Sequence, residues 1–392
     1  MNKVQLNGGQ NGLENLAHMK MIGESVFVGR SAGAMNMSNA TKSVLIGYEA
    51  GRHSRDTENN IYIGYRAGHR SVSDKNNVFI GTNAGYTNTI GYSNIFVGTH
   101  VGYSNRAGSH NVFIGDHAGA DNQEGLRNIF VGTESGMRNL HGSDNVFLGY
   151  ASGKNNIAGI SNVFLGYQTG INNSFGNDNV FIGKDTGRNN HVGSNNVFCG
   201  SSAGGNNVRG DKNVFVGYSS GLNNTDGHDN CMIGTYTGKG NNGGSFNTFL
   251  GNDVGLQNNW GSFNTYIGNK TGQYSINSMS NVMIGNNAGM NLKYSSNNVF
   301  VGSCSGKNSL NSRNNIYIGH SAGLDNNNDT KNTYENSMII NIISAIDTIE
   351  NIDMIEWLGQ NIINNKYMYH NPIHILFNNG LGTFEMTTIA NE

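Results

Sequence analysis

The 392-residue sequence has little charge, almost no proline and no long apolar run. The single proline excludes a collagen-like triple helix. Charged residues make up only 13% of the chain and the formal net charge is -2, so no basic patch is present for nucleic acid or an anionic membrane surface. No window approaches the ~18 apolar residues of a membrane-spanning helix, and the first eight residues lack the apolar core of a signal peptide. We therefore expect no nucleic-acid partner, no membrane insertion and no classical secretion.

Glycine is abundant, with 57 residues, and it marks a 17-residue repeat. The motif N-[VI]-[FY]-[IVL]-G-x-x-[AST]-G occurs eighteen times, with its first glycine running from Gly29 to Gly319. After one 18-residue step every interval is 17, and a second glycine follows four residues after the first in every copy. The structural glycines are represented by the pairs Gly81 and Gly85, Gly98 and Gly102, Gly115 and Gly119, and Gly132 and Gly136.

A third glycine lies ten residues after the first in eleven consecutive copies, from Gly91 to Gly261. Outside that block other residues replace it, for example Asp74 and Ser278. The array therefore has a regular middle and degenerate ends, which is the pattern expected when terminal units act as caps.

The three residues before the first glycine are β-branched, aromatic and aliphatic, which predicts a short strand. We take as the strand core Val112, Phe113 and Ile114, and Val146, Phe147 and Leu148. Both faces of such a strand are apolar, so both need cover. One face can fill the interior of a coil, and the other, most simply the phenylalanine face, needs a second surface such as another strand or a partner chain. The Gly, Asn, Ser and Asp residues between strands are suited to tight corners.

One copy cannot fold alone, because three buried apolar side chains do not offset the entropy of ordering 17 residues. Stacked copies gain backbone hydrogen bonds, and the Asn residues that open most strands can form an amide ladder, as at Asn77, Asn94, Asn111 and Asn128. The sequence thus predicts an all-β parallel β-solenoid, with one or two copies per rung. Its thin core favours a homo-oligomer.

The two ends differ from the repeat array, which covers residues 25–323. We expect an N-terminal cap at 1–24, a polar linker at 324–336, and a C-terminal cap or trimerisation element of α+β type at 337–392. Within that last segment, residues 337–340 indicate a final degenerate strand, 343–363 a helix, and 373–380 a strand entering a turn.

The cysteines stand inside the repeats, at Cys199, Cys231 and Cys304. The first two occupy positions where other copies carry Val, Ile or Leu, which favours a buried apolar role over a disulfide or metal role. In stacked rungs these two would lie about 10 Å apart, beyond disulfide reach.

The repeat motif resembles the head repeats of trimeric autotransporter adhesins and related repeats in phage and giant-virus fibre proteins. The likeness extends from Ser25 to Gly323. It implies a left-handed parallel β-roll, three chains to a shaft, and a role in attachment. The resemblance also implies a glycan or host-surface receptor as partner and a location on a virion surface or extracellular appendage.

Several residue patterns imitate catalytic or ligand-binding sites. The stretches 149–154 and 302–307 resemble phosphate loops, but neither has the required spacing, and both are repeat corners. Acidic residues shift from copy to copy, unlike those of calcium-binding repeats, and no regular exposed threonine row favours ice binding. His100 and His117 share a repeat position and could gather a metal, although a solvated corner is the simpler interpretation.

Carboxylates at Asp144, Asp178 and Asp229 also share one position, and the first two would lie about 10 Å apart, near the separation found in inverting glycosidases. That position precedes the strand-opening Asn, where Asp commonly serves a turn. We therefore assign no catalytic, cofactor-binding or metal-binding residue, and expect a non-enzymatic structural fibre, shaft or appendage protein that needs no cofactor. The alternatives are a carbohydrate-binding adhesin with the same fold and a glycan-cleaving spike.

Overall fold

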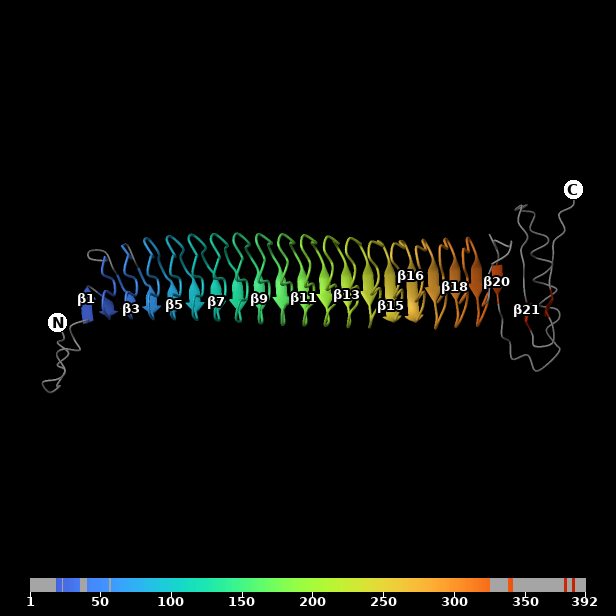
Figure 1. Cartoon of the computed structure of the whole chain (residues 1–392), viewed down its shortest axis with the longest axis horizontal. Coiled ribbons are helices and arrows are strands. Elements are labelled where there is room, and N and C mark those ends of the chain that lie inside the picture. Colours follow the sequence, from blue (N-terminus) through green and yellow to red (C-terminus); the bar gives the residue numbers. More distant parts are fainter. Residues whose placement is uncertain are drawn as a thin grey trace, which may run out of the picture. The chain divides into compact units, whose positions relative to one another are not determined.

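The computed structural model describes residues 19–22, 24–35, 41–55, 58–324, 338–340, 377–378 and 383–384. Most of these residues form a parallel β-solenoid, shown in Figure 1, and none of the described residues is in a helix. The all-β solenoid prediction is confirmed. The chain divides into two compact units, Met1–Tyr218 and Ser219–Glu392, which are described in turn.

The first unit stacks one short strand per repeat. Each strand pairs in parallel with the next copy, in a register that places Val163 opposite Val180 and Phe164 opposite Phe181. One 17-residue copy therefore makes one rung, which decides between the two predicted possibilities. The strands are β1 (Met19–Ile22), β2 (Ser25–Val28), β3 (Val44–Ile46), β4 (Ile61–Ile63), β5 (Val78–Ile80), β6 (Ile95–Val97), β7 (Val112–Ile114), β8 (Ile129–Val131), β9 (Val146–Leu148), β10 (Val163–Leu165), β11 (Val180–Ile182), β12 (Val197–Cys199) and β13 (Val214–Val216).

The second unit repeats the same parallel pairing and then departs from it near its end. Its strands are β14 (Cys231–Ile233), β15 (Thr248–Asn252), β16 (Thr265–Asn269), β17 (Val282–Ile284), β18 (Val299–Val301), β19 (Ile316–Ile318), β20 (Met338–Ile340), β21 (Phe377–Asn378) and β22 (Thr383–Phe384). Strand β20 pairs in parallel with β19, so the expected final strand at 337–340 is present. Strands β21 and β22 form an antiparallel pair, and of the strand and turn expected at 373–380 only residues 377–378 are described.

The described residues include only part of the two chain ends for which predictions were made. At the start of the first unit, β1 pairs antiparallel with β2 and so covers the edge of the first rung. The predicted helix at 343–363 and nearly all of the predicted linker at 324–336 lie outside the described residues.

The phenylalanine in the middle of each strand forms the interior of the coil. Phe113 and Phe147 are fully buried, and the Phe147 ring stacks between those of Phe130 and Phe164 with centroids 4.8 Å away on each side. The prediction that the phenylalanine face points outward is wrong. The two aliphatic residues that flank each phenylalanine form the outer face instead, because side chains alternate along a strand.

The first two glycines of each copy meet different steric demands at the corner that follows the strand. Gly149 has a φ of +130°, and a Cβ there would overlap the carbonyl oxygen of Gly166 on the next rung. Gly153 has a φ of +59°, and a Cβ there would overlap the ring of Phe147. Because L side chains rarely adopt these backbone angles and no space remains, glycine is required at both positions.

Buried asparagines form two ladders along the stack. In the predicted ladder, Asn111 donates its Nδ2 to the carbonyl of Gly125 at 2.8 Å, and its Oδ1 accepts the backbone N–H of Asn128 at 2.9 Å. A second ladder, which the sequence reading missed, joins Nδ2 of Asn122 to Oδ1 of Asn105 at 2.7 Å. Nδ2 of Asn122 also reaches the Gly125 carbonyl, at 3.3 Å. Asparagines of both ladders thus donate to the carbonyl of the third glycine, here Gly125. A Cβ on Gly125 would overlap the amide oxygen of Asn122.

One degenerate copy places a carboxyl group in the core. Asp74 occupies the third-glycine position, is fully buried, and accepts hydrogen bonds from the hydroxyl of Tyr62 and from Nδ2 of Asn88. Tyr62 stands where most copies have phenylalanine. The two departures from the motif therefore compensate for each other, because the buried hydroxyl needs a partner. Burial raises the pKa of Asp74 from 3.8 to about 6.

Because Asp74 is buried, we expect the free energy of unfolding to fall as the pH rises from about 4 to about 6. The folded pKa lies above the unfolded one, so the contribution is complete below pH 3.8 and is lost as Asp74 ionises. The shift corresponds to about 3 kcal/mol. Urea unfolding across this pH range should show wild type losing stability relative to Asp74→Asn. Tyr62→Phe should move the loss to higher pH, because the Tyr62 hydrogen bond lowers the pKa of Asp74. A difference between wild type and Asp74→Asn that does not change with pH would contradict this assignment.

Candidate functional site

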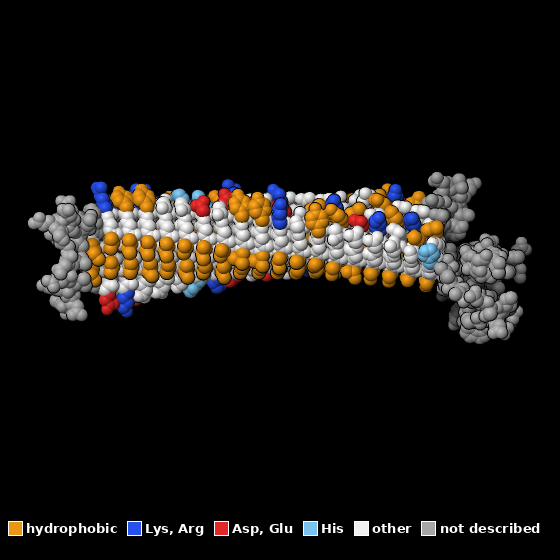
Figure 2. Space-filling view, turned by 90° about the horizontal axis from the view of Figure 1, so that it is seen from below, with side chains coloured by type: hydrophobic (Ala, Val, Ile, Leu, Met, Phe, Trp, Pro, Cys, Tyr) orange, Lys and Arg blue, Asp and Glu red, His pale blue; other side chains and the backbone are white. Residues whose placement is uncertain are grey.

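Among the described residues of each unit, the outer face of the strands carries the largest set of exposed apolar side chains. The first and third residues of every strand from β3 to β13, and likewise from β14 to β19, lie on this face and are half-buried or exposed. We call these residues the aliphatic strip. In the first unit Ile80, Ile114 and Ile129 are 37%, 40% and 41% exposed. Figure 2 shows the strip as rows of hydrophobic side chains with uncharged surface along one side.

The aliphatic strip includes four of the six residues that the sequence analysis assigned to the strand core. Ile114 and Leu148 are exposed, and Val112 and Val146 are half-buried. The cysteines are also displaced from their expected place, since Cys199 and Cys231 belong to the strip and are half-buried. The expected buried apolar role of these two cysteines is therefore wrong. All three cysteines are free thiols, and partial burial raises the pKa of Cys231.

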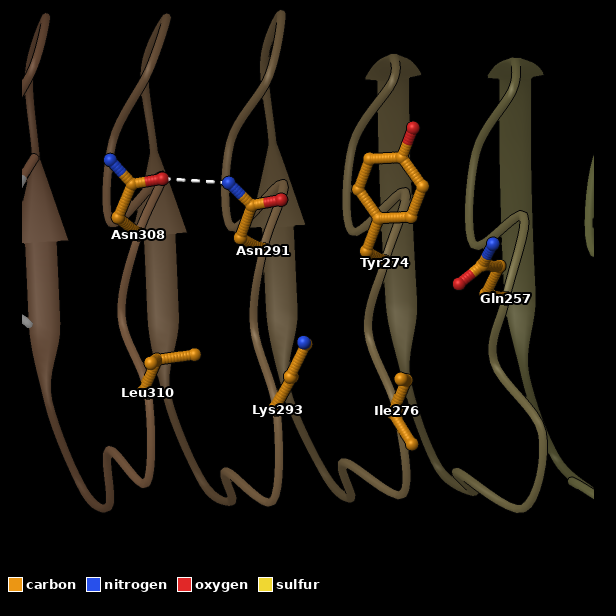
Figure 3. A pocket seen from close by; sticks show the side chains of 7 residues that line it. All are labelled: Gln257, Tyr274, Ile276, Asn291, Lys293, Asn308 and Leu310. Atoms are coloured by element: carbon orange, nitrogen blue, oxygen red, sulfur yellow. Dashed lines mark hydrogen bonds between the residues drawn. The ribbon is translucent and has the colours of Figure 1, made fainter.

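A shallow, open groove of about 380 Å³ runs along one side of the second unit. Figure 3 shows its two walls, which are rows of equivalent residues from consecutive rungs. One wall carries hydrogen-bonding groups, and Nδ2 of Asn291 donates to Oδ1 of Asn308 at 2.7 Å. The other wall is mainly aliphatic. The lining residues are Gln257, Tyr274, Asn291 and Asn308 on the first wall and Ile276, Lys293 and Leu310 on the second.

Exposed aromatic rings lie on the loops of the same unit. Trp260 is 59% exposed, and its ring occupies the space that a side chain at Gly243 on the preceding rung would fill. The rings of Phe246 and Phe263 stack with centroids 4.9 Å apart and are 45% and 55% exposed. These rings offer flat, exposed apolar surfaces.

Two histidines and a carboxylate meet on a corner of the first unit. His100 and His117 stack on adjacent rungs with ring centroids 5.0 Å apart, as their shared repeat position predicts. Asp116 occupies a different column of the repeat, so the period does not predict its place at this corner. Its Oδ2 lies 3.0 Å from Nδ1 of His117. One nitrogen from each ring and an Asp116 oxygen lie within 4.8 Å of one another.

The aspartates that share the turn position serve that turn. Asp144, Asp178 and Asp229 have φ values of +60°, +56° and +55°, in the left-handed region that Asp tolerates. Nε and Nη2 of Arg127 contact the two carboxylate oxygens of Asp144 at 2.6 and 2.8 Å. This pairing lowers the pKa of Asp144. A carboxyl group held ionised is unsuited to act as the general acid of a glycosidase.

The first phosphate-loop imitation is a repeat corner, as expected. Lys154 forms an ion pair with Glu134 at 2.8 Å. Gly149 and Gly153 take the same backbone angles as their counterparts in other copies. The ammonium group of Lys154 therefore already has an anionic partner on the solenoid surface.

Comparison with known proteins yields no relatives for this chain. No protein-family model, no curated protein and no solved structure matches it. In the described part of the chain, no helix is long and apolar enough to cross a membrane.

Proposed function

We propose that this chain is a structural fibre or appendage protein that self-associates as a trimer through the aliphatic strip. The observation that carries the proposal is the strip itself, which continues through eleven consecutive rungs, β3 to β13, of the first unit. Monomeric proteins rarely expose contiguous apolar patches larger than ~600 Å². A second copy is the natural occupant, because its rows have the same rung spacing and the same lack of charge.

The trimeric state and the appendage location follow from the resemblance to trimeric adhesin heads and viral fibre proteins. A parallel bundle of three solenoids would turn each strip toward the other two chains. Each strip isoleucine that becomes buried there contributes roughly 1 kcal/mol. The corners and loops would stay outside, where attachment to a glycan or a host-surface receptor takes place.

Light scattering coupled to size exclusion tests the association directly. Wild type should have three times the 42.1 kDa chain mass. The double variant Ile114→Lys/Leu148→Lys should run as a folded monomer, because both side chains point away from the core and charged groups resist burial. Ile160→Lys is the matched control, since Ile160 is 45% exposed but lies off the strip. A monomeric wild type, or equal dissociation by the control, would refute the proposal.

Carbohydrate binding is the second candidate, and the groove of the second unit favours it. Amides and Tyr274 on one wall can satisfy sugar hydroxyls, and exposed rings such as Trp260 can stack on the apolar faces of sugars. The candidates differ in their readout. A binding module would show saturable glycan binding that maps to this groove, whether or not the chain self-associates.

A further inference from the structure

The corner that holds His100 and His117 has a geometry set by the solenoid. Both residues have left-handed backbone angles, with φ values of +52° and +56°, and both sit two residues after the first glycine of their copy. Because one copy makes one rung, this placement brings the two imidazoles face to face, with planes 22° apart. Asp116 precedes His117 and supplies a carboxylate on the same corner.

We propose that His100, Asp116 and His117 bind a divalent transition-metal ion such as Zn²⁺ or Cu²⁺. Two imidazoles and one carboxylate are a ligand set suited to these ions. The 3.0 Å separation of Nδ1 of His117 and Oδ2 of Asp116 matches that of two ligands at about 90° on a square-planar Cu²⁺ ion with bonds of about 2.0–2.2 Å. Tetrahedral Zn²⁺ needs these two atoms a few tenths of an ångström farther apart. A small rotation of the His100 side chain brings its nitrogen from the present spacing, within 4.8 Å, to the same ion.

The neighbour on the preceding rung can orient His100. Its Nε2 lies 3.1 Å from the side-chain amide of Asn83, whereas its Nδ1 is shielded from solvent and has no hydrogen-bond partner. Turning the Asn83 amide so that its oxygen accepts Nε2–H leaves the lone pair on Nδ1. A ligand histidine commonly donates its other ring N–H to an oxygen in this way. Metal binding would thus give a partner to the buried Nδ1 of His100, which otherwise makes no hydrogen bond.

Solvent access and charge are both compatible with binding. The side chains of His117 and Asp116 are 39% and 50% exposed, so an ion can enter and water can complete its coordination. The ion takes the place of the hydrogen between Nδ1 of His117 and Oδ2 of Asp116, and the neutral imidazole then carries its proton on Nε2. The ion then links two adjacent rungs of one chain, so the site takes no ligand from a second copy.

The repeat itself supplies well-matched variants. His117→Ser is tolerated by precedent, because serine takes the same position and backbone angle at Ser31, Ser202, Ser219 and Ser321. Asp116→Thr copies Thr99 and Thr133 from the neighbouring rungs. His110→Ser is the control, since His110 is an exposed histidine of the next corner that contacts Tyr92 instead of another histidine.

Titration of the full-length, chelator-treated protein with Zn²⁺ should show one site per chain. Calorimetry should show that the affinity for Zn²⁺ is about tenfold lower, or lower still, in His117→Ser and Asp116→Thr. Electron paramagnetic resonance of the Cu²⁺ form should show coupling to two imidazole nitrogens in wild type and to one in His117→Ser. Unchanged affinity in His117→Ser, equal weakening by His110→Ser, or no binding at millimolar Zn²⁺ would overturn the inference.

Discussion

Replacing Phe147 with alanine is expected to lower the free energy of unfolding by about 3–5 kcal/mol. Phe147 is fully buried and stacks on both neighbouring rings, so alanine leaves a cavity and removes two ring contacts. The cavity cannot close from the side, because Gly153 has no side chain to move into it. Each rung is also stabilised by its neighbours, so the damage extends to the adjacent copies. Urea unfolding followed by circular dichroism measures the change.

Val146→Thr is the matched control for this prediction. Val146 is the neighbouring residue of the same strand but lies on the outer face, and threonine occupies its position at Thr248 and Thr265. We expect a change within about 0.5 kcal/mol for the isolated chain. Equal losses for the two variants would show that the phenylalanine column is not the core.

Asn145→Ala is expected to cost roughly 2–5 kcal/mol, because several buried hydrogen bonds disappear together. Nδ2 of Asn145 donates to the carbonyl of Gly159 at 2.9 Å, and its Oδ1 accepts the backbone N–H of Asn162 at 3.0 Å. Alanine leaves that N–H buried without its partner. The free energy of unfolding, measured as for Phe147→Ala, reports the loss.

The same part of the chain provides a control amide near the surface. Nδ2 of Asn155 donates to Oδ1 of Asn172 at 3.0 Å in a partly buried row of amides. Water can replace this bond, so Asn155→Ala should cost less than about 1 kcal/mol. If the Asn145 and Asn155 variants lose the same amount, the buried ladder has no special role in stability.

Much of the fold was predictable because the repeat period shows which residues lie on equivalent rungs. The glycines, the strand positions and the strand-opening asparagine ladder all follow from aligning the copies. The orientation of the strand did not follow, because Val112, Phe113 and Ile114 are all apolar and polarity does not distinguish the two faces. The second glycine held the missing signal, since Gly119 adopts a left-handed angle directly against the ring of Phe113.

The side-chain partners at the corners were predictable only within a single column of the repeat. His100 and His117 share a column, so their contact followed from the period. Asp116 lies in another column, and only the corner geometry brings its carboxylate to His117. Tyr62 and Asp74 are twelve residues apart, and their hydrogen bond likewise depends on how the rung closes on itself.

Because successive rungs make equivalent contacts, the gene for such a chain can lose or gain whole copies of the repeat. Within the first unit, an in-frame loss of residues 146–162 would bring Val163 beside Ile129, where Val146 now lies, with the same register and the same kind of neighbours. A deletion whose length is not a multiple of 17 must be absorbed within one corner, as the 18-residue step between Gly29 and Gly47 is, or it disrupts the asparagine ladders and glycine corners. Recombination between copies can therefore change the number of rungs one at a time while each intermediate protein still folds.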